Sequence, residues 1–194
     1  MKHIAIVDCS VTKTAHHCYN RLVKNFGKTL TYHSPSLLGN LSLEEDNNAS
    51  GYIIFGSYSN VSEFLPWQVE LSNIMKQHIL NKTPVFGICF GHQLMAHAFG
   101  GIISENKDGS YFEGTREIEF CHDYGTIKKG KKLKVAVGHG YCVEKKPDSF
   151  VQMATSEDCT YDALRHETYP YFGVQCHPEA SDYFLLNEIK NEID

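Results

Sequence analysis

The first half of the chain alternates short, wholly apolar runs with longer segments in which apolar residues recur every three or four positions. Ile4–Val7 and Tyr52–Phe55 are apolar runs of this kind, and such runs are typical of strands that are covered on both faces. The longer segments have the spacing of amphipathic helices. This alternation predicts parallel strands joined by crossover helices, and therefore an α/β sheet flanked by helices.

In this half we expect strands at 4–7, 29–33, 52–55 and 84–88, and helices at 14–27, 62–80 and 91–99. Thr14 is the expected N-cap of the first helix, and Gly27 is expected to end it. Pro66 is expected in the first turn of the second helix, where a missing N–H costs nothing. Residues 34–50 are rich in Pro, Gly, Ser and Asn and predict a loop with one helical turn near 37–43.

The second half has a different pattern, in which short strand-like segments follow one another between turns. We expect these strands at 115–121, 133–137, 150–154, 161–166 and 171–176. Polar and apolar residues alternate over Arg116–Phe120, which predicts one wet face and antiparallel pairing. A last helix over 181–193 is expected to pack on the sheet. We predict one mixed α/β domain over residues 1–194, with a mostly parallel central sheet and an antiparallel, strand-rich second half.

Composition argues against several classes of protein. The chain has 18 Lys and Arg against 23 Asp and Glu, so we expect no nonspecific nucleic-acid binding. No apolar run approaches the roughly 20 residues that span a membrane, and Asp8 interrupts the first run too early for a secretory leader. The seven scattered cysteines predict reduced thiols in a cytoplasmic protein.

One cysteine lies in a distinctive setting. Gly87-Ile88-Cys89-Phe90-Gly91 follows a predicted buried strand and begins a predicted helix, which is the pattern of a nucleophile elbow. Glycines are needed there because side chains at a strained turn would clash with nearby backbone. The helix N-terminus also favours a thiolate. Most free cysteines are simply small buried hydrophobes, but the flanking glycines favour the nucleophile interpretation.

A thiolate nucleophile needs a base, and the base needs an orienting group. Gln175-Cys176-His177-Pro178-Glu179 supplies both at the end of a predicted strand. Two residues apart in an extended segment, His177 and Glu179 point to the same side. A solvated loop is the simpler interpretation of an isolated His-x-Glu. However, both segments follow the carboxyl ends of strands, where open α/β sheets place their sites.

Gly87–Gln93 followed by Phe99-Gly100-Gly101, together with Gly173–Glu179, resembles the two signatures of class I (triad-type) glutamine amidotransferase domains. Their order and their separation of roughly 90 residues fit as well. The resemblance implies a flavodoxin-like fold with Cys89 as nucleophile, His177 as general base and acid, and Glu179 as its orienting residue. It also implies the reaction, in which the glutamine side-chain amide is attacked, ammonia leaves, and water hydrolyses a γ-glutamyl thioester.

The resemblance further implies an oxyanion hole made of backbone N–H groups. One comes from Phe90, and the other comes from the turn at Gly56-Ser57, where Ser57 replaces a second glycine of the family. That replacement leaves open whether the turn is active without a partner.

Substrate contacts are implied at two further places. Gln93 matches a family glutamine that contacts the substrate; the alternative is an exposed residue in the first helical turn. Gly138-His139-Gly140-Tyr141 aligns with the loop that holds the α-amino and carboxylate groups, with Gly138 in place of a serine and Tyr141 in place of an acid.

Within the family, residues 156–166 look most like the amidotransferase subunit of GMP synthetase. The leading hypothesis is a glutaminase subunit that passes ammonia to a separate ATP-dependent synthetase. A γ-glutamyl hydrolase is the alternative, and a non-catalytic regulatory module is a third. No phosphate-binding or dinucleotide motif is present, so we expect no cofactor, and we expect no metal site and no membrane contact.

Overall fold

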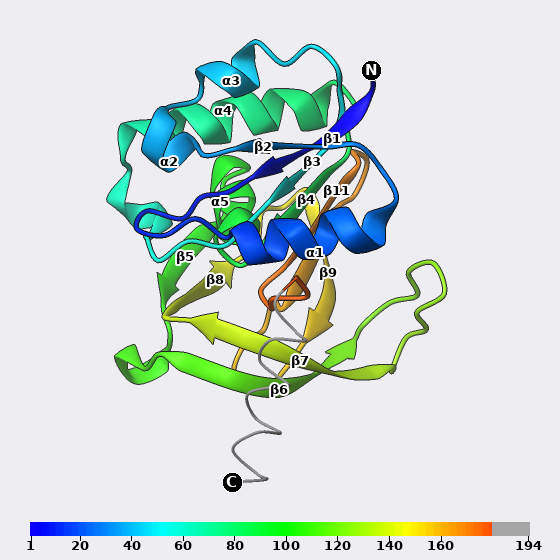
Figure 1. Ribbon diagram of the computed structural model, residues 1–194. Helices are drawn as coiled ribbons and strands as arrows, with labels where there is room; N and C mark the ends of the chain where they lie inside the picture. Colours follow the sequence, from blue (N-terminus) through cyan, green and yellow to red (C-terminus); the bar gives the residue numbers. More distant parts are fainter. Residues whose placement is uncertain (180–194) are drawn as a thin grey trace, which may run out of the picture.

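The computed structural model describes residues 1–179, so the helix predicted over 181–193 lies outside the described residues (Figure 1). In this part of the chain, nine strands form one mixed sheet in the order β2-β1-β3-β4-β11-β10-β9-β6-β7. The prediction of a mixed α/β fold is confirmed. No helix among the described residues is both long and apolar enough to cross a membrane.

One half of the sheet is parallel, as predicted. Its strands are β2 (Leu30–His33), β1 (His3–Val7), β3 (Ala49–Ile54), β4 (Val85–Ile88) and β11 (Tyr171–Val174). Strand β11 comes from the end of the described chain but lies directly beside β4, with Val174 in register with Ile88. Since the two strands are parallel, residue 89 and the segment 175–179 follow their carboxyl ends and lie side by side.

The other half is antiparallel, also as predicted. It contains β10 (Ala163–His166), β9 (Phe150–Thr155), β6 (Phe112–Phe120) and β7 (Lys132–His139). The long β6 and β7 form a ribbon at the far edge of the sheet (Figure 1). A separate antiparallel pair, β5 (Ile102–Glu105) and β8 (Tyr141–Lys145), was not predicted.

Helices cover both faces of the parallel half. Alternate residues of β1 belong to different cores, because side chains of a strand point to opposite faces. Ala5 and Val7 pack with α4 (Pro66–Leu80) and α5 (Phe90–Ala98). Ile6 packs in the second core, which includes Cys18 of α1 (His16–Phe26).

Two helix starts differ from the prediction. Ala15, not Thr14, is the N-cap of α1, and its N–H donates to the Asp8 carboxylate at 2.7 Å. The helix has no side-chain N-cap bond, and a buried carboxylate just after β1 instead fixes the residue that precedes the helix. The second predicted helix begins at Pro66 rather than at residue 62, because a short 3-10 turn, η1 (Val61–Glu63), comes first and Phe64 breaks it with a φ of 51°.

The stretch 34–50 contains more structure than the single turn predicted for it. Two short helices lie there, α2 (Pro35–Leu38) and α3 (Leu41–Glu44). Asn40 between them donates to the Trp67 carbonyl at 3.1 Å and to Glu70 at 2.7 Å. These bonds attach the segment to the first turns of α4.

Candidate active site

Cys89 is the residue on which β4 turns into α5. Its backbone has φ 48° and ψ −101°, a conformation that non-glycine residues rarely adopt. The flanking glycines are required: a Cβ on Gly87 would stand 2.7 Å from the Gly91 carbonyl oxygen, and one on Gly91 would stand 2.6 Å from the Ile54 oxygen. The sequence thus forces a tight elbow that places the sulfur at the N-terminus of α5.

His177 and Glu179 follow β11 at the same edge of the sheet. Nδ1 of His177 lies 2.8 Å from Oε1 of Glu179, and the glutamate side chain is only 6% exposed. Two backbone contacts anchor this segment. The His177 N–H donates to the Ala136 carbonyl at 2.9 Å, and Arg21 donates to the Glu179 carbonyl at 2.5 Å. The carboxylate can therefore hold a proton on Nδ1 and leave Nε2 for chemistry.

Gly56 is the point at which the cysteine and the histidine meet. A Cβ placed on Gly56 would be 2.8 Å from Cε1 of His177 and 3.6 Å from Cβ of Cys89. Both side chains therefore pack against this glycine, which follows β3. The structure brings Cys89, His177 and Glu179 together in the order that a nucleophile, its base and an orienting group require.

The charge state of His177 depends on its two neighbours. Burial disfavours the imidazolium, but the negative charges of Cys89 and Glu179 outweigh burial and raise the pKa of His177 well above its ordinary value. The carboxylate of Glu179 therefore helps to keep the imidazole protonated.

The implied oxyanion-hole residues lie around the sulfur. Phe90 is the first residue of α5, so its N–H has no partner within the helix. Ser57 lines the same pocket as Cys89. Non-glycine residues with positive φ among residues 1–179 are Phe64, Lys82, Cys89 and Asp108. Ser57 is not one of them, so its side chain causes no backbone strain in this conformation.

A pocket of about 160 Å³ opens beside the sulfur. Among the described residues it is lined by Ser57–Asn60, Cys89, Gln93, Tyr111 and Gly138–Tyr141. It therefore collects all the predicted substrate-binding positions. Tyr58 and Ser59 continue the turn predicted at Gly56-Ser57, whereas Asn60 and Tyr111 belong to no motif and were missed by sequence reasoning. A larger hollow of about 440 Å³ beside Arg116 and Ser156 contains none of the predicted site residues.

Gln93 is buried, with 4% exposure, so the alternative of an exposed helix residue is wrong. Its Nε2 donates to the Tyr141 carbonyl at 2.7 Å and to Oε1 of Gln175 at 3.1 Å. Both amide hydrogens are thus used inside the protein. Through its bond to the Tyr141 carbonyl, Gln93 holds the segment 138–141 in place.

The predicted loop 138–141 is the junction of β7 and β8, with only Gly140 between the two strands. His139 is buried; burial, helped by the charge of Arg116, lowers its pKa to about 3, so the ring is neutral. Its carbonyl accepts from Asn106 at 2.7 Å. The Tyr141 hydroxyl donates to Glu105 at 2.8 Å rather than into the pocket. The side chain that replaces the family acid therefore forms part of the rim.

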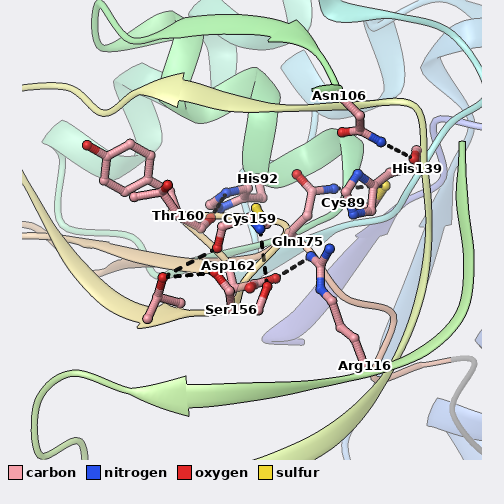
Figure 2. Close-up of polar contacts among 12 residues, drawn as sticks. Cys89, His92, Asn106, Arg116, His139, Ser156, Cys159, Thr160, Asp162 and Gln175 are labelled. Carbon is pink, nitrogen blue, oxygen red and sulfur yellow. Dashed lines mark hydrogen bonds and ion pairs between the residues drawn. The ribbon is translucent and has the colours of Figure 1, made fainter. Parts of the chain in front are cut away.

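A buried polar layer lies next to Cys89 (Figure 2). Gln175 has no exposed surface, and its Nε2 donates to Sγ of Cys89 at 3.5 Å. Its N–H donates to the Asp162 carbonyl at 2.8 Å. The Asp162 carboxylate pairs with Arg116 of β6, and both side chains are buried. Gln175 was missed as a site residue, although it precedes His177 by two positions in the second signature.

The described residues show no metal-binding arrangement. No group of three or more His, Cys, Asp or Glu side chains in residues 1–179 could hold a metal ion.

The chain is similar to proteins of one known family. A family model described as glutamine amidotransferase class-I matches residues 5–183. A relative from Methanosarcina mazei, named as one subunit of a glutamine-hydrolyzing GMP synthase, is 40% identical over 100 residues, which cover 51% of this chain and 52% of the relative. The protein of the same name from Thermococcus kodakarensis is 38% identical over 112 residues, covering 57% and 58%. The chain thus spans about half the length of these curated relatives.

The fold also matches solved structures. The crystal structure of a glutamine amidotransferase from Thermotoga maritima superposes with a TM-score of 0.76 at 17% identity, over 100% of this chain and 85% of that chain. At this identity the likeness concerns the fold alone.

Proposed function

Because the chain belongs to the class I glutamine amidotransferase family, we propose that it hydrolyses the side-chain amide of glutamine through a γ-glutamyl thioester on Cys89. The observation that carries the proposal is the meeting of Cys89 and His177 at Gly56, with Nδ1 of His177 held 2.8 Å from Glu179. We also propose that residues 1–194 form one domain, because strands from both halves join a single sheet.

The proposed reaction has two stages, formation of the thioester and its hydrolysis, and His177 transfers protons in both. His177 holds the proton of Cys89, and the thiolate attacks the amide carbon to form a C–S bond. The oxyanion receives hydrogen bonds from the backbone N–H groups of Phe90 and Ser57. The imidazolium then gives its proton to the leaving nitrogen, the C–N bond breaks and ammonia departs. Water, deprotonated by His177, attacks the thioester and releases glutamate and the cysteine.

We propose that the ammonia is used by a separate synthetase subunit. The names of the curated relatives support this, because each is named as one subunit of GMP synthase. The acceptor would then be a nucleotide precursor held by the partner.

Hydrolysis of a γ-glutamyl amide without a partner is the second candidate function. The ordinary φ at Ser57 favours it, because the turn avoids the positive φ that its side chain would make costly. An amidotransferase that waits for its partner often keeps this turn in an inactive form.

The two candidates are separated by measuring glutamate release from glutamine and from a panel of γ-glutamyl amides, with and without the synthetase. The ammonia-supply role predicts weak glutaminase activity that the synthetase stimulates. Efficient cleavage of a γ-glutamyl amide with negligible glutaminase activity would overturn that role and leave the Cys89 mechanism in place. Wild-type activity in Cys89→Ala would remove the mechanism as well.

A further inference from the structure

The side chain of Gln175 makes two hydrogen bonds in the interior of the protein. Its Nε2 donates to Sγ of Cys89 at 3.5 Å, and its Oε1 accepts from Nε2 of Gln93 at 3.1 Å. The residue is wholly buried, and its own N–H is bonded to the Asp162 carbonyl at 2.8 Å. Both the backbone and the amide are therefore fixed in place.

The orientation of this amide follows from the network. Nε2 of Gln93 donates to the Tyr141 carbonyl at 2.7 Å, and a carbonyl can only accept. The NH₂ group of Gln93 must therefore be the end that faces both Tyr141 and Gln175. It follows that Gln175 presents its oxygen to Gln93 and its NH₂ group to the sulfur.

We propose that Gln175 is a positioning residue that holds the Cys89 sulfur as a thiolate and connects it, through Gln93, to the loop 138–141. The proposal rests on the proposed function, because it concerns the nucleophile of that reaction. Gln175 donates to the anion without competing for its proton, since an amide does not titrate.

A second contact of the sulfur acts against this donor. Sγ lies 3.7 Å from the Gly138 carbonyl oxygen, an acceptor that suits a thiol but repels a thiolate. A hydrogen bond to a charged group is stronger than one to a neutral group, so the Gln175 N–H favours the thiolate over the thiol. The two contacts oppose each other, and the amide shifts the balance toward the reactive form.

Other titratable side chains surround the sulfur and set the background for a test. His177 comes from the segment after β11, and Tyr111 precedes β6. His139 ends β7 and lines the same pocket as Cys89; burial, helped by the charge of Arg116, lowers its pKa to about 3 and keeps the imidazole neutral. The pKa of His177 depends on the charge of the sulfur, so the measured midpoint belongs to the Cys89–His177 pair. Wild type and Gln175→Met differ only in the amide donor, so a difference between their midpoints reports the loss of that donor.

The test is the rate at which iodoacetamide alkylates Cys89, followed across pH in the full chain and located among the seven cysteines by peptide mass mapping. In Gln175→Met, which lacks the donor, we expect the pH midpoint of alkylation to rise by about one unit, a roughly tenfold slower reaction at a fixed pH below the midpoint. Gln152→Met is the matched control. Gln152 is half-buried on β9 and donates to the Thr160 carbonyl at 2.6 Å, so its loss should leave the midpoint unchanged.

A second variant protects the test against misfolding. Gln175→Glu keeps the size of the side chain and an acceptor for Gln93, and its carboxylate repels a thiolate, so we expect a shift in the same direction. An unchanged midpoint in a folded variant, or a loss of reactivity that is equal at every pH, would overturn the proposal. Alkylation does not require hydrolysis, so a wild-type protein that alkylates normally but cleaves no γ-glutamyl substrate would overturn the proposed function alone.

Discussion

Replacing Gly56 by alanine tests whether the histidine acts from the position in which the structure holds it. The new methyl group would lie 2.8 Å from Cε1 of His177 and 3.6 Å from Cβ of Cys89. Ordinary contacts begin near 3.4 Å, so the imidazole or the strand must give way by about 0.6 Å. The contact with Cys89 needs no adjustment, and the N–H of residue 56 is retained.

The structure therefore predicts a displaced base beside an intact nucleophile. A misplacement of about 1 Å in a catalytic group can cost roughly 100-fold in rate. For the smaller shift we expect kcat/KM to fall by roughly 10- to 100-fold, which corresponds to about 1.4 to 2.7 kcal/mol of transition-state stabilisation. The stability of the fold should fall by about 1 kcal/mol, the lower end of the cost of overpacking.

The assay is steady-state release of glutamate from whichever γ-glutamyl substrate the wild type cleaves, together with urea unfolding. Gly51→Ala is the matched control, because Gly51 lies on β3 as well and its Cβ would meet the Pro84 carbonyl oxygen at 3.3 Å, away from the site. We expect that variant to lose some stability and no activity. Wild-type kcat/KM in Gly56→Ala would refute the reasoning, because it would mean that His177 does not act from this position.

The other side chains in and around the site give three more predictions. Cys89→Ala should lower turnover by several orders of magnitude with little change in the urea midpoint, since it removes one sulfur atom. His177→Ala should approach that loss, whereas Glu179→Gln keeps the shape of the side chain and should cost less in kcat; equal losses would show that Glu179 itself transfers protons. Burial lowers the pKa of His92 from 6.5 to about 4. The unfolded chain therefore takes up a proton that the folded chain refuses, and stability should fall by roughly 3 kcal/mol from pH 6.5 to pH 4. His92→Gln should flatten that slope in urea titrations.

The parallel half of the sheet could be predicted because short apolar runs in the sequence mark its strands. Tyr52–Phe55 is wholly apolar and lies within or beside β3, so burial on both faces can be read from neighbouring residues. The pair β5 and β8 gives no such signal. Ile102–Glu105 has two apolar residues followed by two polar ones, and its partner Tyr141–Lys145 lies far along the chain. Only the tertiary fold makes these segments strands.

The site residues also divide into those that local sequence predicts and those that depend on the tertiary fold. Gly87–Gly91 and His177–Glu179 could be found because strain and strand geometry act within a few residues of each other. Gln175 and Gln93 could not be assigned as a pair, because their contact joins α5 to the end of β11 and depends on the register of two strands. The exposure of Gln93 was open for the same reason. Its position in the first turn of a helix does not reveal what packs above it.

The backbone strain at Cys89 and the position of its sulfur have one structural cause. A non-glycine residue in such a conformation costs about 1 to 3 kcal/mol, and it persists only where the surroundings hold it there. Here the N–H of Cys89 donates to Val174 of β11 at 2.8 Å, and its carbonyl accepts from the N–H of Gln93 at 3.0 Å. These bonds join the elbow to the strand that precedes His177 and to the first turn of α5. A relaxed backbone at residue 89 would move the sulfur away from both elements, so the conformation that costs stability is also the one that the proposed mechanism needs.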